Sequence, residues 1–193
     1  MCASPLPLPE GRSRPRRYCS PACRQRAYRQ RESIPAEMRK ADRWVRWRKV
    51  PRNGRVTKQP IQCDGRPASS TDAGTWSPYA AVKRSKVGSG LGFALGAGVG
   101  CIDLDHCIED GRVLPWAQRI LDVAPATYIE VSQSGEGIHI FGLLDEGPGR
   151  NRRRGGVNVE VYSVGRYIAV TGDKHPSSGA RLASIGGLVQ QLI

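Results

Sequence analysis

Short apolar runs separated by turn residues fill most of the chain after residue 90. Runs of this length and composition are typical of β-strands. We expect strands over residues 91–95, 99–103, 127–132, 138–143, 157–162 and 167–171. Ser77-Pro78 predicts a helix that ends near Arg84, and Pro115 predicts a second helix that ends before Pro125. The pattern predicts a mixed α/β or α+β domain from about residue 40 onward.

The first third of the chain follows a different pattern. Residues 1–17 are rich in Pro, Arg and Gly, which predicts irregular structure. Ser20-Pro21 predicts the start of a short basic helix that continues through residues 23–31. Asn53-Gly54 predicts a tight hairpin turn. We therefore divide the chain into a basic segment, residues 1–35, and a main domain, residues 36–193.

The positive charge is concentrated in the first third. The net charge is +13, and residues 11–60 carry 17 Lys and Arg against three Asp and Glu, whereas residues 61–193 carry 13 of each sign. This asymmetry favours a polyanion-binding arm, and a solubilising basic tail is the alternative. The arginines that would contact nucleic acid are Arg16, Arg17, Arg24, Arg26, Arg29 and Arg31.

No apolar run approaches the roughly 20 residues of a membrane span, and no signal-peptide core precedes the domain. We expect a cytoplasmic protein that does not contact a membrane. Its six cysteines should then be thiols or metal ligands rather than disulfides.

Asp103-Leu104-Asp105 is the most informative triplet of the sequence. It ends the predicted strand 99–103, and side chains two apart on a strand share a face, roughly 6.6 Å apart along it. Two carboxylates this close repel each other and are costly to bury without a partner. A divalent cation would remove both costs, so the triplet indicates a Mg²⁺ or Mn²⁺ site. An EF-hand loop is excluded, because Cys107 and Ile108 occupy the positions that need an acid or amide and a Gly.

A third carboxylate lies on the strand 157–162, which alternates cleanly. Val157, Val159 and Val161 share one face, so Glu160 lies on the other, together with Asn158 and Tyr162. This position makes Glu160 available to join the aspartates. A solvated outer face is the alternative interpretation of the same alternation.

A Gly-rich turn, Ser134–Gly137, leads into the strand that carries His139. Backbone N–H groups near Gly135 and Gly137 can approach a phosphate closely, and His139 can donate to one. A histidine satisfied within the core is the alternative. Arg166, in the turn after the Glu160 strand, is a candidate for binding phosphate bidentately or else a surface charge.

Cys19 and Cys23 lie across the turn into the basic helix and form a plausible half of a zinc site, with Cys2 as a third ligand. A structural zinc site needs four ligands, and no fourth Cys or His occurs before residue 63. The zinc interpretation and the free-thiol interpretation both remain open. Cys101 is expected in the core.

These motifs, in this order, resemble one family. The chain over residues 44–173 is similar to the bifunctional primase–polymerase domain of phage and plasmid replication proteins, in the archaeo-eukaryotic primase superfamily. The matching segments are residues 75–79, 90–95, 100–107, 127–139 and 160–172. The resemblance implies an α+β fold with a primase-like core, a mixed or antiparallel sheet and flanking helices.

The resemblance also implies roles for the site residues. Asp103, Asp105 and Glu160 would hold Mg²⁺ or Mn²⁺, and many relatives have Asp at the third position. His139 would contact the phosphates of the incoming nucleotide, with the turn residues Ser134, Gly135 and Gly137. Separately, residues 15–31 resemble a zinc-finger segment of actinobacterial proteins, in which a Cys-x-x-Cys pair comes first. Cys2 would be the second member of that pair, and the first would lie before Met1.

The function implied is DNA primase and polymerase activity, a nucleotidyl transfer by a two-metal mechanism in phage or plasmid replication. The partners would be a single-stranded DNA template, nucleoside triphosphates and a separate replicative helicase. Two alternatives stay open: a non-catalytic DNA-binding replication module with a degenerate polymerase-like core, and a metal-dependent nuclease.

Overall fold

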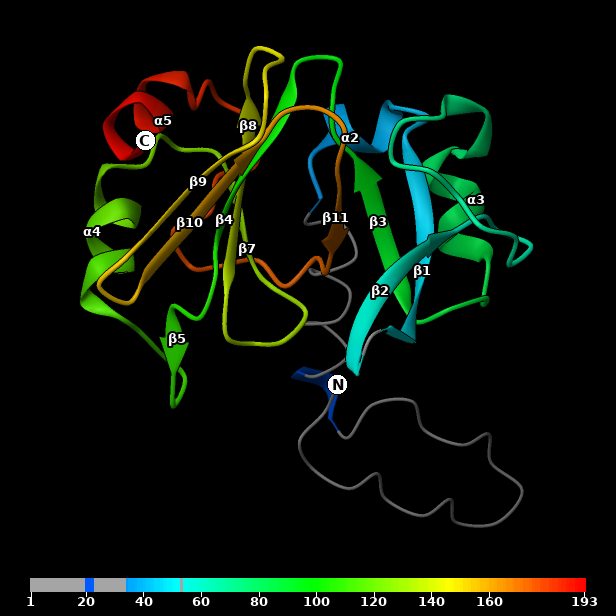
Figure 1. Ribbon diagram of the computed structural model, residues 1–193, viewed down its shortest axis with the longest axis horizontal. Coiled ribbons are helices and arrows are strands. Elements are labelled where there is room, and N and C mark those ends of the chain that lie inside the picture. The colour runs from blue at the N-terminus through cyan, green and yellow to red at the C-terminus, as the bar shows by residue number, and fades with distance from the viewer. Residues whose placement is uncertain (1–19, 23–33, 53) are drawn as a thin grey trace.

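The computed structural model describes residues 20–22, 34–52 and 54–193, which form two antiparallel sheets packed against each other (Figure 1). Sheet A has the strand order β11-β3-β1-β2, and sheet B has the order β7-β8-β4-β10-β9. The strands of sheet A are β1 (Trp44–Arg52), β2 (Arg55–Ile61), β3 (Gly90–Ala94) and β11 (Tyr167–Val170). Those of sheet B are β4 (Val99–Leu104), β7 (Tyr128–Val131), β8 (Ile138–Leu143), β9 (Arg150–Arg154) and β10 (Val157–Tyr162). A small separate hairpin joins β5 (Ile108–Glu109) to β6 (Arg112–Val113).

Short helices lie around the two sheets. They are α2 (Ala36–Lys40), α3 (Tyr79–Arg84), α4 (Pro115–Val123) and α5 (Gly186–Leu192), and a 3₁₀ turn, η1, covers Ala73–Thr75. Figure 1 shows α4 and α5 beside sheet B and α3 beside sheet A. The predicted α+β fold is confirmed, and every strand ladder in the described residues is antiparallel.

The two faces of sheet B pack differently. On β4, Ile102 and Leu104 face a core that α4 and α5 close, and the alternating valines of β10 join the same cluster. On the opposite face, Cys101 is buried, as predicted, and packs with Phe141 of β8 against Phe93 of sheet A. Because side chains alternate along a strand, Asp103 follows Cys101 on this second face, beyond the apolar contact between the sheets.

The chain joins β1 to β2 by a two-residue connection, since Arg52 pairs with Arg55. Gly54 in that connection has φ +74°, in the left-handed region that a type I′ turn requires. The predicted hairpin is therefore confirmed. The β1–β2 hairpin forms the free edge of sheet A, because β2 is its last strand.

Most predicted elements match within one or two residues, but several observed elements were not predicted, among them β9 and α5. Strand β9 has the sequence Arg-Asn-Arg-Arg-Arg, with all five residues exposed, and carries no apolar pattern. Helix α5 begins with two glycines, which disfavour a helix. The predicted basic helix over 23–31 lies outside the described residues.

Candidate active site

Three carboxylates meet on the second face of sheet B. Asp103, Asp105 and Glu160 each offer an oxygen, and these atoms lie within 4.8 Å of one another. Each of the three residues is half-buried. The structure thus brings together three acids that were predicted from two separate segments of the sequence.

The strand register explains why these side chains meet. Asp103 of β4 lies directly opposite His139 of β8 on one side and Glu160 of β10 on the other. His139 in turn lies opposite Glu130 of β7. Directly opposed residues of an antiparallel pair point to the same face. Four strands therefore place Glu130, His139, Asp103 and Glu160 in one row across the sheet, called the polar row below.

Asp103 is the least satisfied member of the polar row. Its Oδ1 is buried and accepts no hydrogen bond from any described residue, and His139 Nε2 lies 3.7 Å from it. Burial raises the pKa of Asp103 to about 6, helped by the charges of Asp105 and Glu160 and opposed by His139 and Lys58. An ionised Asp103 is therefore costly unless a cation binds there.

Asp105 and Glu160 are held by their neighbours. The Asn158 amide donates to Asp105 Oδ2 at 3.1 Å. Glu160 accepts from the Tyr162 hydroxyl at 2.7 Å and from the guanidinium of Arg153 at its other oxygen. Burial alone would raise the pKa of Glu160, but these two hydrogen bonds outweigh it and place the pKa below its ordinary value.

His139 is fixed from behind by Glu130, which is fully buried. Glu130 accepts from the Tyr128 hydroxyl at 2.7 Å and from the Gly172 backbone N–H at 2.9 Å. A carboxylate held this way accepts hydrogen bonds, so His139 Nδ1, 3.1 Å from Glu130 Oε1, carries the hydrogen. Burial lowers the pKa of His139, but the Glu130 hydrogen bond and the charges of Asp103 and Glu130 outweigh it, so that pKa lies above its ordinary value. His139 Nε2 is left facing Asp103.

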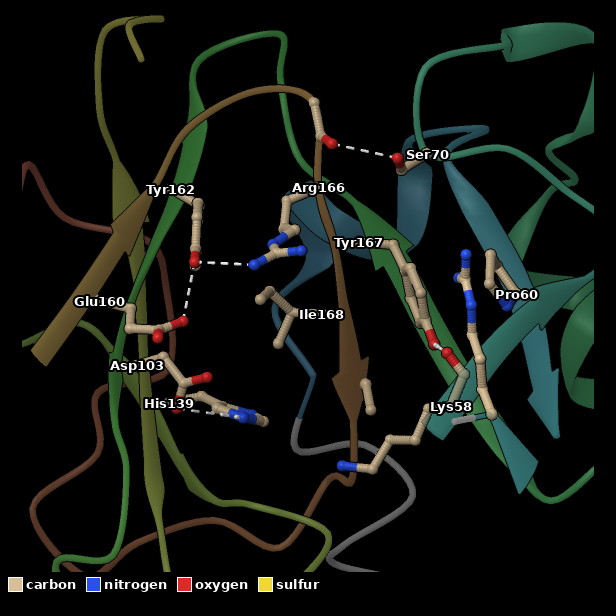
Figure 2. A pocket seen from close by; sticks show the side chains of 13 residues that line it. Lys58, Pro60, Ser70, Asp103, His139, Glu160, Tyr162, Arg166, Tyr167 and Ile168 are labelled. Carbon is tan, nitrogen blue, oxygen red and sulfur yellow. Dashed lines mark hydrogen bonds and ion pairs between the residues drawn. The ribbon is translucent and has the colours of Figure 1, made fainter. Parts of the chain in front are cut away.

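A cavity of about 500 Å³ lies between the polar row and sheet A. Asp103, His139, Glu160 and Tyr162 form one wall, and Lys58 reaches toward them from the other (Figure 2). Desolvation lowers the pKa of Lys58, opposed by the charges of Asp103 and Asp105. Arg166 also lines the cavity, where it donates to the Tyr162 hydroxyl at 2.8 Å. The cavity therefore combines carboxylates with basic groups, as a metal-bound phosphate compound requires.

Tyr167 ties Lys58 to the rest of sheet A. Its hydroxyl donates to the Lys58 carbonyl at 2.6 Å, and its ring crosses Gly92 of β3, where an added Cβ would lie 2.6 Å from the ring. Gly92 is thus required for the crossing. Sequence reasoning missed both this contact and Glu130, because each depends on strand register.

The Gly-rich turn lies apart from this cavity, because none of Ser134, Gly135 and Gly137 is among its lining residues. The turn uses its N–H groups internally: Gly137 donates to Ser132 Oγ at 3.1 Å, and Glu136 to Ser134 Oγ at 3.2 Å. The carbonyl of Glu136 accepts from Cys107 and Ile108. The phosphate role of the turn stays a prediction without a contact that supports it.

The carboxylate group fits a divalent cation. Oxygen donors are the ligands of Mg²⁺ and Mn²⁺, and the unsatisfied Oδ1 of Asp103 is a position that a cation would stabilise. The residues that would hold it are Asp103, Asp105 and Glu160. The candidate zinc ligands and the arginines of the basic arm lie outside the described residues: Cys2, Cys19, Cys23, Arg16, Arg17, Arg24, Arg26, Arg29 and Arg31.

Comparison with known proteins adds one relative. No protein-family model matches the chain. A DNA primase-polymerase of Nitratiruptor phage NrS-1 is 33% identical to it over 141 residues, which cover 67% of this chain. The chain spans about a fifth of that relative, since the match covers 19% of its length. Among the described residues, no helix has the length and apolar character of a membrane span.

Proposed function

The chain belongs to the primase–polymerase family, as its similarity to the phage relative shows. From this premise we propose that it is a nucleotidyltransferase. It would make or extend a DNA primer on a single-stranded template. Residues 36–193 would be the catalytic domain. Residues 1–35 would be the basic segment that holds DNA, with zinc bound by its cysteines. A separate helicase would supply unwound template.

The observation that carries the proposal is the pairing of opposite charges across one cavity. Asp103 and Glu160 line it together with Lys58 and Arg166. Carboxylates alone would also be consistent with a metal-dependent hydrolase. The basic groups on the opposite side of the cavity can in addition bind the phosphates of a nucleoside triphosphate.

Each residue then has a task. Asp103, Asp105 and Glu160 would hold two ions of Mg²⁺ or Mn²⁺, which when bound supply activation of the primer 3′-hydroxyl and neutralisation of the leaving pyrophosphate. His139 would donate from Nε2 to a phosphate oxygen, since Glu130 fixes its other nitrogen. Lys58 and Arg166 would bind the remaining phosphate charge.

A primer-synthesis assay tests the proposal. The full chain is incubated with a single-stranded template, ribonucleotides or deoxyribonucleotides, and Mg²⁺ or Mn²⁺. We expect products that depend on the metal and the template, and their loss in the double variant Asp103→Ala/Asp105→Ala, with thermal unfolding as the check that the variant folds. Unimpaired synthesis by the folded double variant would sink the proposal.

The same assay separates the two alternatives. Degradation of a labelled strand without added nucleotides would indicate a nuclease. DNA binding that survives chelation, with no synthesis under any condition, would indicate a non-catalytic replication module.

A further inference from the structure

The β1–β2 hairpin carries charges that have no anionic partner. From residue 44 to residue 61 the chain has six basic residues and no Asp or Glu. They are Arg46, Arg48, Lys49, Arg52, Arg55 and Lys58. None of them forms an ion pair with a carboxylate in residues 20–22, 34–52 and 54–193. Every described residue from 51 to 58 is exposed.

Two of the six have structural tasks. Arg46 donates to the carbonyls of Val87 and Val82 and so ties β1 to the chain around α3. Arg48 donates to the Gln59 side chain across the hairpin. The remaining four, Lys49, Arg52, Arg55 and Lys58, are the ones with charge to offer a ligand.

The register places these four in like-charged pairs. Lys49 lies directly opposite Lys58, and Arg52 lies directly opposite Arg55. Like charges at directly opposed positions destabilise a sheet, because the Cβ atoms lie only about 4.5–5.5 Å apart. No acid in the hairpin offsets this repulsion. An anion bound at either pair would offset the repulsion there.

The hairpin also leads to the carboxylates. One member of each pair, Arg52 and Lys58, lines the cavity that Asp103 and Glu160 face. The two pairs are three residues apart along β1 and so start from opposite faces of the hairpin, but the long side chains of Arg52 and Lys58 both reach this cavity.

We propose that the β1–β2 hairpin binds the sugar–phosphate backbone of a single DNA strand and directs it to the carboxylates. The inference rests on the proposed function for the identity of the polyanion. It concerns binding without chemistry, so it can be tested in the absence of metal and nucleotides.

The test measures binding of a labelled oligothymidylate to the full chain by fluorescence anisotropy, in chelator, over a series of salt concentrations. For Arg52→Gln/Arg55→Gln we expect a weaker affinity, by about 5-fold per lost contact at ~0.1 M salt, and a salt slope shallower by about 1.4, because each single-strand phosphate contact contributes ~0.7. Thermal stability should be unchanged or higher, because one like-charged pair is removed.

The matched control is Arg150→Gln/Arg154→Gln. It removes the same charge from exposed positions of another edge strand, β9. These two residues lie opposite Val161 and Val157, on the face away from the polar row. The control should keep the affinity and the salt slope.

Three results would overturn the inference. They are an unchanged slope in the hairpin variant, an equal loss in the control, and unchanged DNA affinity with a raised KM for nucleotide. The last would make Arg52 and Arg55 part of the triphosphate site together with Lys58, and not a site for DNA. Failure of the proposed function looks different: the hairpin-dependent DNA binding would persist while no primer is made with any metal.

Discussion

The two walls of the cavity carry opposite charges and are built in opposite ways. The acidic wall belongs to β4 and β10, inner strands of sheet B with neighbours on both sides. The basic residues Lys58 and Arg52 belong to a hairpin at the free edge of sheet A. The acidic positions are thus fixed by hydrogen-bonded register and packing, whereas the basic positions are exposed and can adapt.

This difference separates two kinds of contribution. A substitution on the acidic wall should alter the stability of the fold as well as ligand binding. A substitution of the basic residues Lys58 or Arg52 should weaken ligand binding and leave the stability of the fold unchanged or slightly higher. Four variants test this division, in decreasing order of expected free-energy change.

Glu130→Gln, which removes the support of the acidic wall through His139, should change the free energy of unfolding most. The substitution replaces an oxygen that accepts hydrogen bonds with an amide that donates them, beside the Tyr128 hydroxyl and two backbone N–H groups. We expect the free energy of unfolding to fall by about 3–4 kcal/mol, as for other broken buried networks. Chemical denaturation measures it. Glu136→Gln, at an exposed carboxylate beside His106, should change it by less than about 0.5 kcal/mol.

Asp103→Asn should instead stabilise the fold, when metal ions are removed by a chelator. The pKa of Asp103 is raised to about 6, so above that pH the ionised, buried group destabilises the fold, by at most about 3 kcal/mol. The neutral amide removes this cost, and the melting temperature at pH 8 should rise. The gain should shrink as the pH falls from about 6 to about 4, because Asp103 then becomes protonated in the folded state.

Added Mn²⁺ gives the control for that experiment. It should raise the melting temperature of the wild-type chain more than that of the variant. A wild-type chain as stable as Asp103→Asn in chelator at pH 8 would contradict the electrostatic account of the acidic wall.

Lys58→Gln tests the basic wall. We expect KM for the nucleotide to rise about 10-fold, equal to about 1.4 kcal/mol, with the unfolding free energy unchanged within about 0.5 kcal/mol. Steady-state kinetics and denaturation measure the two quantities. Lys83→Gln, on α3 over the Tyr79 ring, is the charge-matched control, and a similar KM change there would remove Lys58 from the site.

Arg153→Gln should change the free energy of metal binding least of the four. Arg153 of β9 pairs with Glu160, and its side chain is 64% exposed, so solvent screens its charge. It now occupies one oxygen of Glu160, so its removal should tighten Mn²⁺ binding by about 3-fold, as expected for a screened charge. Electron paramagnetic resonance of free Mn²⁺ measures this without nucleotide. Arg154→Gln should bind Mn²⁺ like wild type, and weaker binding by Arg153→Gln would mean that Arg153 orients Glu160 instead.

The sequence could predict the strands that alternate and the acids they carry. The valines of β10 place Glu160 on a defined face, and the spacing of Asp103 and Asp105 is local. The partners of these residues are not local. Glu130 becomes the support of His139 only because β7 pairs with β8 in one register, and no pattern along the chain encodes that pairing.

Strand β9 was missed for a related reason. Its four arginines form a strand because β10 offers a free edge at that point, and not because of their own propensity. The position of Lys58 opposite Asp103 likewise depends on how two sheets pack. The sequence therefore predicts which residues carry the chemistry, whereas only the structure shows which residues lie next to one another.

The polar row has a consequence for folding. Its members come from β4, β7, β8 and β10, which span residues 99–162 of the chain. Contacts of long sequence separation form slowly, so we expect the site to form only together with the fold. Amide hydrogens of the central strand β4 should exchange only through global unfolding, whereas those at the tip of the β1–β2 hairpin should exchange by local opening. The polar row and the fold would then be lost in a single cooperative step.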